Sequence, residues 1–277
     1  MSKPPPWLEV ERGDAPLLLS FPHTGREIPA DCTAGLVSPE RAIRDADWFV
    51  EKLYAFAAEL RATTVRTALS RTVIDVNRDP SGASLYPGQA TTGLVPSETF
   101  DGLPLYLAGH EPGEQEIERR RAEFFSPYHA ALADELARLR AMHGAVVLYD
   151  CHSIRSSIPR LFPGELPVFN IGTNDGKSCS PRLAEAIQTV CRSSPYSHVL
   201  NGRFKGGWIT RRYGQPHTGI HAVQMELAIR SYLHDEAAPH WDADAARPMQ
   251  DVLRKILEAC LEFGRAAVRG DHVRAAG

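Results

Sequence analysis

The sequence predicts an α/β fold with a mostly parallel, mixed central sheet and helices on both faces. Short apolar runs bounded by turns alternate along the chain with longer amphipathic patterns, as strands alternate with crossover helices. No internal repeat or low-complexity linker interrupts the 277 residues, and 43% hydrophobic with 23% charged residues is ordinary globular composition. We therefore expect a single domain over residues 1–277, with flexible ends at about 1–12 and 269–277.

Five apolar runs are the predicted strands. Each is short, contains branched residues and is bounded by turn residues, which favours a strand over a helix. The runs are Leu17–Phe21, Thr72–Val76, Ala145–Tyr149, Val168–Gly172 and His221–Leu227.

Four amphipathic patterns predict helices. The first begins after Ser38, a suitable N-cap that precedes Pro39. Proline fits the first helical turn because the N–H that it lacks would be unpaired there. The apolar stripes run over 43–60, over 114–143 with a kink expected at Pro127, over 183–190 after Ser180-Pro181, and over 249–263.

Charge and composition exclude several classes of protein. The formal net charge of −3 gives no basic surplus for nucleic acid or an anionic membrane surface. No apolar stretch reaches the roughly 18 residues of a membrane span, and the N-terminal segment lacks the apolar run of a signal peptide. We expect a cytoplasmic protein whose partner is a small molecule. The sequence does not determine its oligomeric state.

The five cysteines are expected to be free thiols. Their number is odd and no CxxC pair occurs, which argues against a disulfide framework and a four-thiolate zinc site. Cys151 alone lies beside polar candidates, in the segment YDCHS. Since side chains alternate along a strand, we expect it to point away from them.

Polar residues follow several predicted strands. His23 comes after the first run, Asn77-Arg78 after the second and His152 after the third, while Glu226 lies near the end of the last. In open α/β sheets, ligands bind beyond the carboxyl ends of parallel strands. We therefore expect these side chains to share one edge of the sheet.

Two imidazoles and a carboxylate are the usual protein ligands of a catalytic zinc ion. His23 and His152 supply the imidazoles. For the carboxylate we favour Asp47, which lies beside an apolar stripe where an unpaired charge would be costly. Glu27 and Asp45 are the alternatives, and without a metal Asp47 would pair with an arginine.

Glu226 is the candidate general base. Its apolar context, VQMEL, predicts burial, which would raise the pKa of the carboxyl group toward the useful range. The alternative is a buried ion pair with Arg230.

Arg71 and Arg78 flank the second predicted strand. Guanidinium groups bind carboxylates in a bidentate fork and can polarise a carbonyl, so the pair predicts an anionic substrate. Ordinary ion pairs with Asp75 or Asp79 are the alternative. A glycine-containing loop at 201–210 carries Arg203 and Lys205. It lacks the spacing of a phosphate loop but suits a segment that closes over a small anion, although a plain turn is equally compatible.

Seven segments together resemble the N-formylglutamate amidohydrolase (N-formylglutamate deformylase) family across nearly the whole chain. They are SFPHTGREIP, RDADWFVEKLY, SRTVIDVNRDPSG, LYPGQATTGLVP, YDCHSIRS, FNIGTNDG and NGRFKGGWITRRYG with GIHAVQMELAIRSYL. The resemblance implies hydrolysis of N-formyl-L-glutamate to L-glutamate and formate in histidine degradation. It also implies a fold similar to zinc carboxypeptidases and aspartoacylases.

The wider resemblance implies roles for individual residues. His23, in PHTG, and His152, in DCHS, are expected to bind Zn²⁺, and Asp47, in the DADW segment, is expected as the third ligand. The relatives' HxxE motif is absent, because Arg26 stands three residues after His23. Other divalent metals, cobalt, manganese or iron, suit the same ligands.

The mechanism implied is attack of zinc-bound water on the formyl carbon, with Glu226 as base and Arg71 at the oxyanion. Asn77 and Arg78 are expected to bind one substrate carboxylate. The loop residues Arg203, Gly206 and Gly207 would contact the other. Two alternatives stay open: a zinc deacylase of another N-acyl amino acid, and a non-catalytic binding protein for acidic amino acids.

Overall fold

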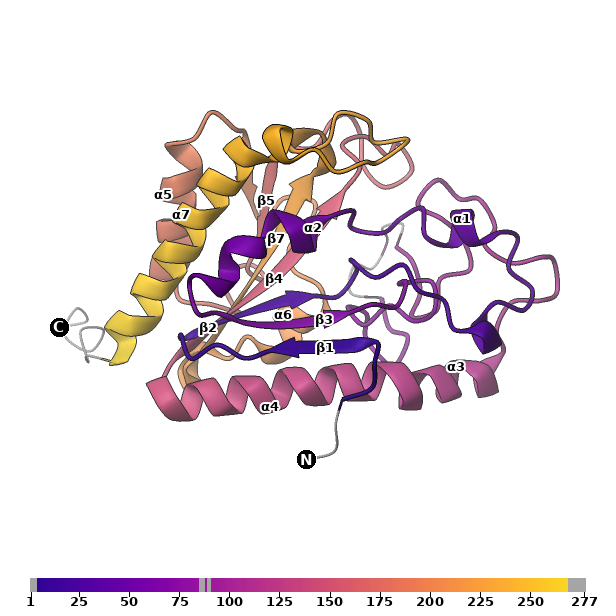
Figure 1. Cartoon of the computed structure of the whole chain (residues 1–277), viewed down its shortest axis with the longest axis horizontal. Helices are drawn as coiled ribbons and strands as arrows, with labels where there is room; N and C mark the ends of the chain where they lie inside the picture. Colours follow the sequence, from indigo (N-terminus) through magenta and orange to yellow (C-terminus); the bar gives the residue numbers. More distant parts are fainter. Residues whose placement is uncertain (1–3, 85–87, 89–90, 269–277) are drawn as a thin grey trace.

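Within the residues described by the computed structural model, 4–84, 88 and 91–268, seven strands form one mixed sheet (Figure 1). Their order is β1-β3-β2-β4-β7-β5-β6. β3, β2, β4 and β7 are mutually parallel, β1 and β5 run antiparallel to their neighbours β3 and β7, and β6 is parallel to β5. The strands are β1 Leu8–Glu11, β2 Leu17–Phe21, β3 Thr63–Thr67, β4 Val146–Ile154, β5 Phe169–Gly172, β6 His198–Leu200 and β7 Ile220–Ala228.

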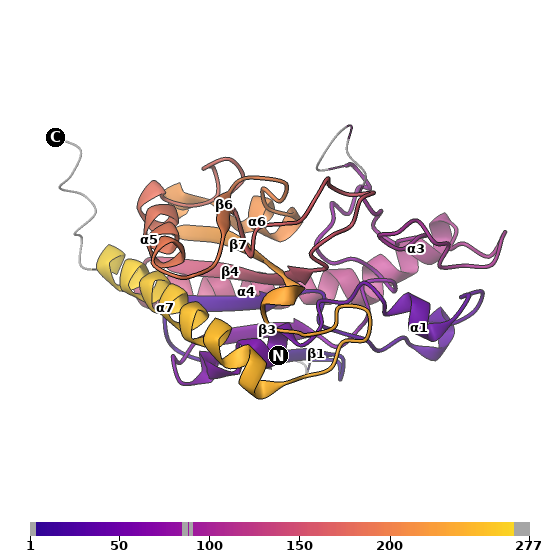
Figure 2. The ribbon, with the colours of Figure 1, turned by 90° about the horizontal axis from the view of Figure 1, so that it is seen from above.

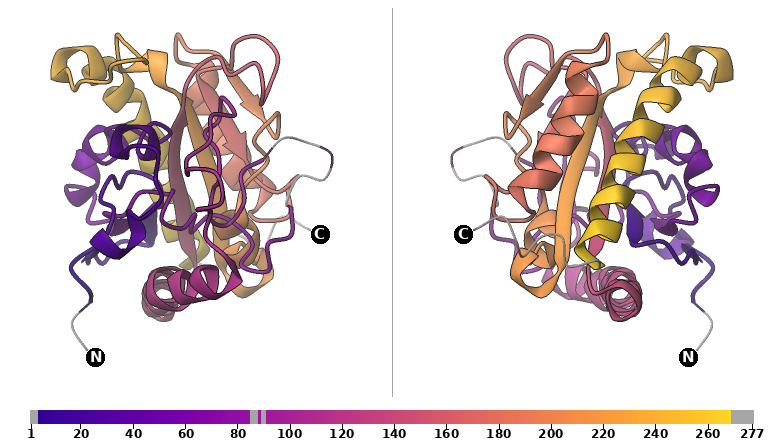
Figure 3. Two further views of the ribbon diagram at one scale, coloured as in Figure 1. Left: turned by 90° about the vertical axis from the view of Figure 1, so that its right-hand side faces the viewer. Right: turned by 90° about the vertical axis from the view of Figure 1, so that its left-hand side faces the viewer.

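Helices cover both faces of the sheet, so the predicted fold class is confirmed. On one face, α2, α5 and α7 pack on a core that includes Tyr149 and Met225. Figure 2 shows α5 and α7 beside the sheet, and Figure 3 gives the two end views. On the other face, α4 and α6 pack against Leu18 and Leu148. The helices are α1 Pro39–Ala42, α2 Val50–Leu53, α3 Glu114–Arg120, α4 Ser126–His143, α5 Pro181–Arg192, α6 Trp208–Tyr213 and α7 Ala243–Val268.

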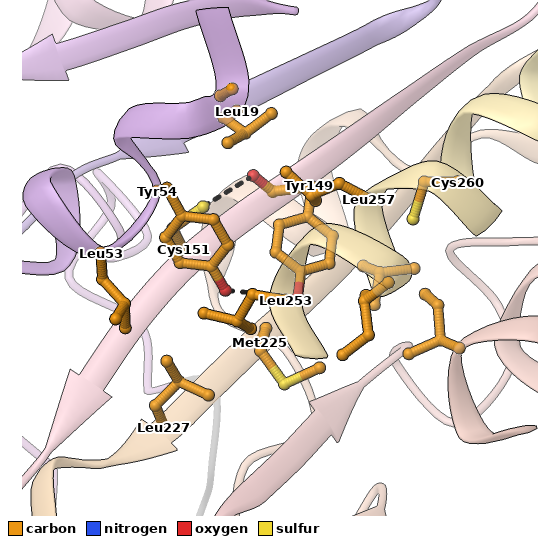
Figure 4. Close-up of a cluster of buried hydrophobic side chains, with 14 of the residues drawn as sticks. Leu19, Leu53, Tyr54, Tyr149, Cys151, Met225, Leu227, Leu253, Leu257 and Cys260 are labelled. Carbon is orange, nitrogen blue, oxygen red and sulfur yellow. Dashed lines mark hydrogen bonds between the residues drawn. The ribbon is translucent and has the colours of Figure 1, made fainter. Parts of the chain in front are cut away.

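Cys151 points into the first core, as expected from strand alternation. Figure 4 shows its sulfur among Leu19, Tyr54 and Tyr149. All five cysteines are free and buried. The thiols therefore contribute packing, and burial raises the pKa of Cys151 well above its ordinary value.

The predicted strand Thr72–Val76 is wrong. This segment turns, with the Val73 N–H donating to Ser70 O and the Arg78 N–H to Asp75 O. Its apolar residues are buried against α4 without any strand partner. The strand of this region is β3, whose alternately buried residues TTVRT gave too weak an apolar signal.

Two further strands differ from expectation. β1 lies inside the N-terminal tail that we expected to be flexible, where it pairs with β3 over four residues. β6 is a short edge strand of three half-buried residues, and no apolar run marks it. Residues 269–277, the expected flexible C-terminal end, lie outside the described residues.

The first predicted helix is divided. Ser38 caps α1 through its side chain, as predicted, but α1 ends at Ala42 and α2 begins only at Val50. Between them the Asp47 N–H donates to His23 O, and Phe49 adopts a left-handed conformation with φ of 60°. The helix is interrupted where the Asp47 N–H bonds to the segment after β2 and not to the preceding helical turn.

The other helices follow their predicted positions. Instead of a kink at Pro127, a π-helical turn at Arg121–Phe125 joins α3 to α4. Ser180 caps α5, and α7 carries a buried apolar face that includes Met249, Leu253 and Leu257.

Candidate active site

The carboxyl ends of β2, β4 and β7 meet at one edge of the sheet, as their parallel pairing requires. His23 lies two residues beyond the end of β2. His152 and Glu226 lie directly opposite each other in the register of β4 and β7. The predicted convergence of these three side chains is therefore present, and the rings of His23 and His152 are 4.9 Å apart between centroids.

Asp47 lies between the two imidazoles. Its Oδ2 atom is 3.0 Å from Nδ1 of His152 and 3.7 Å from Nδ1 of His23, and it accepts a hydrogen bond from the Ser153 N–H. All three side chains are buried, and their ligand atoms lie within 4.8 Å of one another.

The outer nitrogens of both rings are held by carboxylates. His23 Nε2 is 2.7 Å from Asp75 Oδ1, and His152 Nε2 is 3.0 Å from Asp150 Oδ2. A carboxylate behind each imidazole is the usual second layer of a metal site, because it fixes the tautomer and turns the other nitrogen toward the metal. The inner nitrogens here are the two Nδ1 atoms that face Asp47.

Charge at the site favours a cation. Asp47, Asp75, Asp150 and Glu226 are four buried carboxyl groups, opposed by the guanidinium of Arg71 and that of the half-buried Arg78. With both rings neutral, negative charge is in excess. Two imidazole nitrogens and a carboxylate oxygen therefore fit a divalent transition metal.

The pKa values reflect the same crowding. Burial by itself would lower the pKa of His152, but Asp150 and Asp47 raise it well above its ordinary value. Burial would raise the pKa of Asp47, but the two histidines hold it below its ordinary range. The carboxylates around the two rings therefore favour positive charge at this position.

The two alternative ligands lie elsewhere. Glu27 is exposed. Asp45 accepts a hydrogen bond from the Phe100 N–H at 2.7 Å and pairs with Arg155 at 3.4 Å. Of the three carboxylates considered from the sequence, Asp47 is the one brought between the histidines.

Glu226 is buried, and its neighbours fix its orientation. Burial raises the pKa of its carboxyl group to about 8. Gln224 accepts the Gly207 N–H through Oε1 at 2.6 Å, which leaves its Nε2 to donate to Glu226 Oε2 at 3.3 Å. Arg230 pairs with Glu165 instead, so the alternative of a Glu226–Arg230 ion pair is not formed.

Arg71 combines both roles that the sequence left open. It pairs with Asp75 at 2.5 Å, the structural alternative, and its guanidinium also lines the pocket beside the histidines. Its Cζ atom lies 4.8 Å from the centroid of the Phe100 ring.

The Asn77 side chain is engaged by protein groups. Its Oδ1 atom accepts the Ile209 N–H at 2.8 Å, and its Nδ2 atom is 3.0 Å from His152 Nε2 and 3.4 Å from Asp150 Oδ2. Gly207 has no Cβ, and one built there would lie 2.5 Å from the same amide nitrogen. These contacts make Asn77 a link between α6 and the site.

Arg78 and Arg203 both line the pocket. Arg78 is half-buried and donates to the carbonyl and hydroxyl oxygens of Thr92, while Arg203 donates to Leu161 O. The Arg203 loop is bound to the loop after β5, since the Asn174 N–H donates to Lys205 O and the Thr173 N–H to Asn201 Oδ1. Gly206 has a φ of 112° and does not line the pocket, whereas Gly207 does.

The residues converge on one pocket of about 610 Å³, including its open mouth. One side is polar, with the histidines, the arginines and Glu226. The apolar part of the lining is formed by Phe100, Ile154, Leu161 and Phe204.

Comparison with known proteins identifies the family. The profile of the N-formylglutamate amidohydrolases matches residues 15–233. The chain is 49% identical to the N-formylglutamate deformylase of Pseudomonas aeruginosa, over 93% of this chain and 97% of that protein. It is 47% identical to the N-formylglutamate deformylase of Pseudomonas putida, over 93% and 96%. The chain belongs to the N-formylglutamate amidohydrolase family.

Solved structures support the fold of this amidohydrolase. N-formylglutamate amidohydrolase from Ralstonia eutropha JMP134 superposes with a TM-score of 0.77 at 24% identity, covering 95% of this chain and 99% of that one. A gene product of Agrobacterium tumefaciens gives a TM-score of 0.67 at 22% identity, covering 91% and 95%. The expected resemblance of the sequence to this family is thus confirmed.

Sequence reasoning missed three polar contributors to this candidate site. Asp150 and Asp75 hold the histidines, and Gln224 holds Glu226. All three lie within apolar runs, YDCH, VIDV and AVQME. A polar residue inside such a run was the available signal, because a buried polar group needs a partner.

Proposed function

We propose that this protein hydrolyses N-formyl-L-glutamate to L-glutamate and formate. The observation that carries the proposal is the 49% identity to a protein named N-formylglutamate deformylase, which extends over 97% of that protein. The pocket supports it, because a buried glutamate and arginines lie beside a group that fits a metal. In histidine degradation, the pathway implied by the resemblance, the reaction would proceed in the cytoplasm. None of the helices in the described ranges is long and apolar enough to cross a bilayer.

His23, Asp47 and His152 would hold one divalent ion, which we propose to be Zn²⁺. When bound there, the ion supplies a Lewis acid that acidifies water and polarises the formyl carbonyl. Asp75 and Asp150 keep the outer nitrogens of the two rings engaged. They thereby direct both Nδ1 atoms inward.

Glu226 is the proton carrier of the proposed reaction. It accepts a proton from the water that attacks the formyl carbon and delivers a proton to the leaving amine nitrogen. A pKa near the working pH suits both halves of this task, and burial raises the pKa of Glu226 to about 8 in the metal-free chain. Gln224 keeps the carboxylate turned toward the pocket through its amide nitrogen.

The arginines account for an anionic substrate. Arg71 is held by Asp75 at the inner end of the pocket, where its charge would stabilise the oxygen of the tetrahedral intermediate. Arg78 and Arg203 also line the pocket. They would bind the two carboxylates of formylglutamate. Asn77 also lines the pocket, and since its Oδ1 atom accepts the Ile209 N–H, its amide nitrogen is the group that would meet a substrate carboxylate.

The test is release of glutamate and formate from N-formyl-L-glutamate by purified protein, before and after chelation and after addition of Zn²⁺. We expect release that the chelator abolishes and zinc restores. Zinc binding without release would direct attention to other N-acyl amino acids. Tight glutamate binding with neither zinc nor release would favour the non-catalytic binding protein.

A further inference from the structure

We propose that Phe100 sets the size of the acyl group that this site accepts, restricting it to formyl. The inference rests on the proposed function and assigns its specificity to one side chain. Nothing in the sequence pattern marks Phe100, which lies in a segment far from the predicted strands and helices.

The Phe100 ring packs against the Arg71 guanidinium, and both residues line the pocket. Phe100 is 7% exposed, and its ring lies 4.8 Å from Arg71 Cζ. The scissile carbonyl carbon carries an oxygen, the amide nitrogen and a third substituent. If Arg71 binds the oxygen, the third substituent lies against the Phe100 ring. In a formyl group that substituent is a hydrogen atom, and in an acetyl group it is a methyl group.

The backbone around Phe100 is fixed. Its N–H donates to Asp45 Oδ2 at 2.7 Å, and the Thr99 N–H donates to Leu103 O at 2.8 Å. The following residue, Asp101, is bound by Arg155 at 2.9 Å and by Arg44 at 3.2 Å. The ring is therefore carried by a turn that is tied to both the α1–α2 loop and the end of β4.

The ring is packed among apolar side chains, and it also borders a second, small pocket lined by Asp45 and Ser153. Phe100 belongs to a small buried cluster with Ile154, Ile158, Phe162, Leu166 and Ala228. Protein interiors are close-packed, so a side chain pressed from the pocket has no room to move into this cluster. The ring thus acts as a firm wall, and one methyl group at such a wall is worth about 10–200-fold in discrimination.

The experiment compares kcat/KM for N-formyl-L-glutamate and N-acetyl-L-glutamate in the unchanged protein and in Phe100→Leu and Phe100→Ala. The matched control is Phe162→Leu. Phe162 belongs to the same cluster and is 5% exposed, but it is not among the described residues that line the pocket. Phe162 packs against Phe204 and not against Arg71, so the control loses similar packing but leaves the Phe100 ring in place. Thermal unfolding of each variant reports its folding.

We expect the ratio of acetyl to formyl kcat/KM to rise at least tenfold in Phe100→Leu, to rise further in Phe100→Ala, and to stay within twofold in Phe162→Leu. A folded Phe100→Leu whose ratio stays within twofold, or changes no more than that of Phe162→Leu, overturns the inference while the proposed function stands. Absence of formyl hydrolysis by the unchanged, zinc-loaded protein overturns the proposed function and the inference with it.

Discussion

The two sides of the site are built differently. His152 and Glu226 lie on adjacent strands, opposite each other in a ladder that continues over nine residue pairs. His23, Asp47 and Asp75 lie in irregular segments, where individual hydrogen bonds such as Asp47 N–H to His23 O position them. The strand side inherits its geometry from the sheet, whereas the loop side depends on a few polar contacts. Substitutions on the two sides should therefore fail in different ways.

The largest effect is expected from the loop-borne ligand. Asp47→Ala should lose tight metal binding and reduce turnover by roughly 10³-fold or more, because two imidazoles alone leave the ion under-coordinated. Metal content and formate release measure both. Glu27→Ala is the matched control, since Glu27 is exposed, and it should retain metal and activity. Full metal occupancy in Asp47→Ala would contradict the ligand assignment.

On the strand side, Glu226→Gln should reduce kcat by about 10²–10⁴-fold while metal content stays unchanged. Glutamine has the shape of glutamate but cannot carry the proton. Steady-state kinetics and metal analysis of the same preparation make the test. Turnover within twofold of the unchanged protein would remove Glu226 from the role of base.

The residues behind the two histidines sharpen the comparison. Replacing a carboxylate behind a metal-binding imidazole typically costs 10–100-fold in metal affinity. Asp75→Asn should lie at the upper end, because Asp75 also holds Arg71 and accepts the Asn77 N–H. Asp150→Asn, on β4, should lie at the lower end. Competition titrations with a chelator measure the two affinities, and the reverse order would break the distinction between loop side and strand side.

Gln224→Leu should lower kcat about tenfold and leave metal content unchanged. A hydrogen bond to a charged group contributes about 1.5–3 kcal/mol, and the variant removes the donor at 3.3 Å from Glu226. Gln224→Glu is the companion variant: it retains the side-chain length but places a second carboxylate beside Glu226. Activity close to that of the unchanged protein in Gln224→Leu would show that the strands alone hold the base.

The smallest effect concerns stability, at the place where helix α4 contacts the irregular segment that carries Asp75. His129 on α4 contacts Val76 O and the Tyr213 hydroxyl, and burial lowers its pKa from 6.5 to about 4. Between pH 4 and pH 6.5 the unfolded chain binds more protons than the folded chain. The contribution of neutral His129 to the free energy of unfolding is therefore complete above pH 6.5 and is lost as the pH falls through 4. Between pH 7 and pH 5, we expect the free energy of unfolding of His129→Gln to fall by about 1–2 kcal/mol less than that of the unchanged protein. Urea unfolding at pH 7 and pH 5 measures it, and equal pH dependence in both proteins would contradict it.

The predictability of the fold follows the strength of its apolar patterns. β2, β4, β5 and β7 are buried runs and were located from the sequence, as were the capped starts of α1 and α5. β1, β3 and β6 are edge or half-buried strands, which carry a weaker apolar pattern. The segment Thr72–Val76 has the apolar pattern of a strand in sequence, because burial without strand pairing produces the same pattern.

The predictability of the site follows its two sides. Strand ends placed His152 and Glu226 at one edge, and His23 followed directly from β2. The sequence predicted Asp47 as a ligand because an unpaired carboxylate beside apolar residues would be costly. The helix predicted around it is nevertheless interrupted, and Phe49 adopts a left-handed conformation there. Asn77 lines the pocket, and its substrate contact stays a prediction; the sequence did not indicate that its side chain also accepts the Ile209 N–H, 132 residues away.

The sequence by itself determined the alternation of strands and helices, the strand-borne residues and the family. It did so because side-chain periodicity and short motifs are local properties of the chain. Only the tertiary structure decided which carboxylate lies between the histidines, which groups stand behind them and which ring packs against Arg71. Those contacts join loops that are distant in sequence, and their geometry depends on hydrogen bonds that exist only once the sheet has assembled.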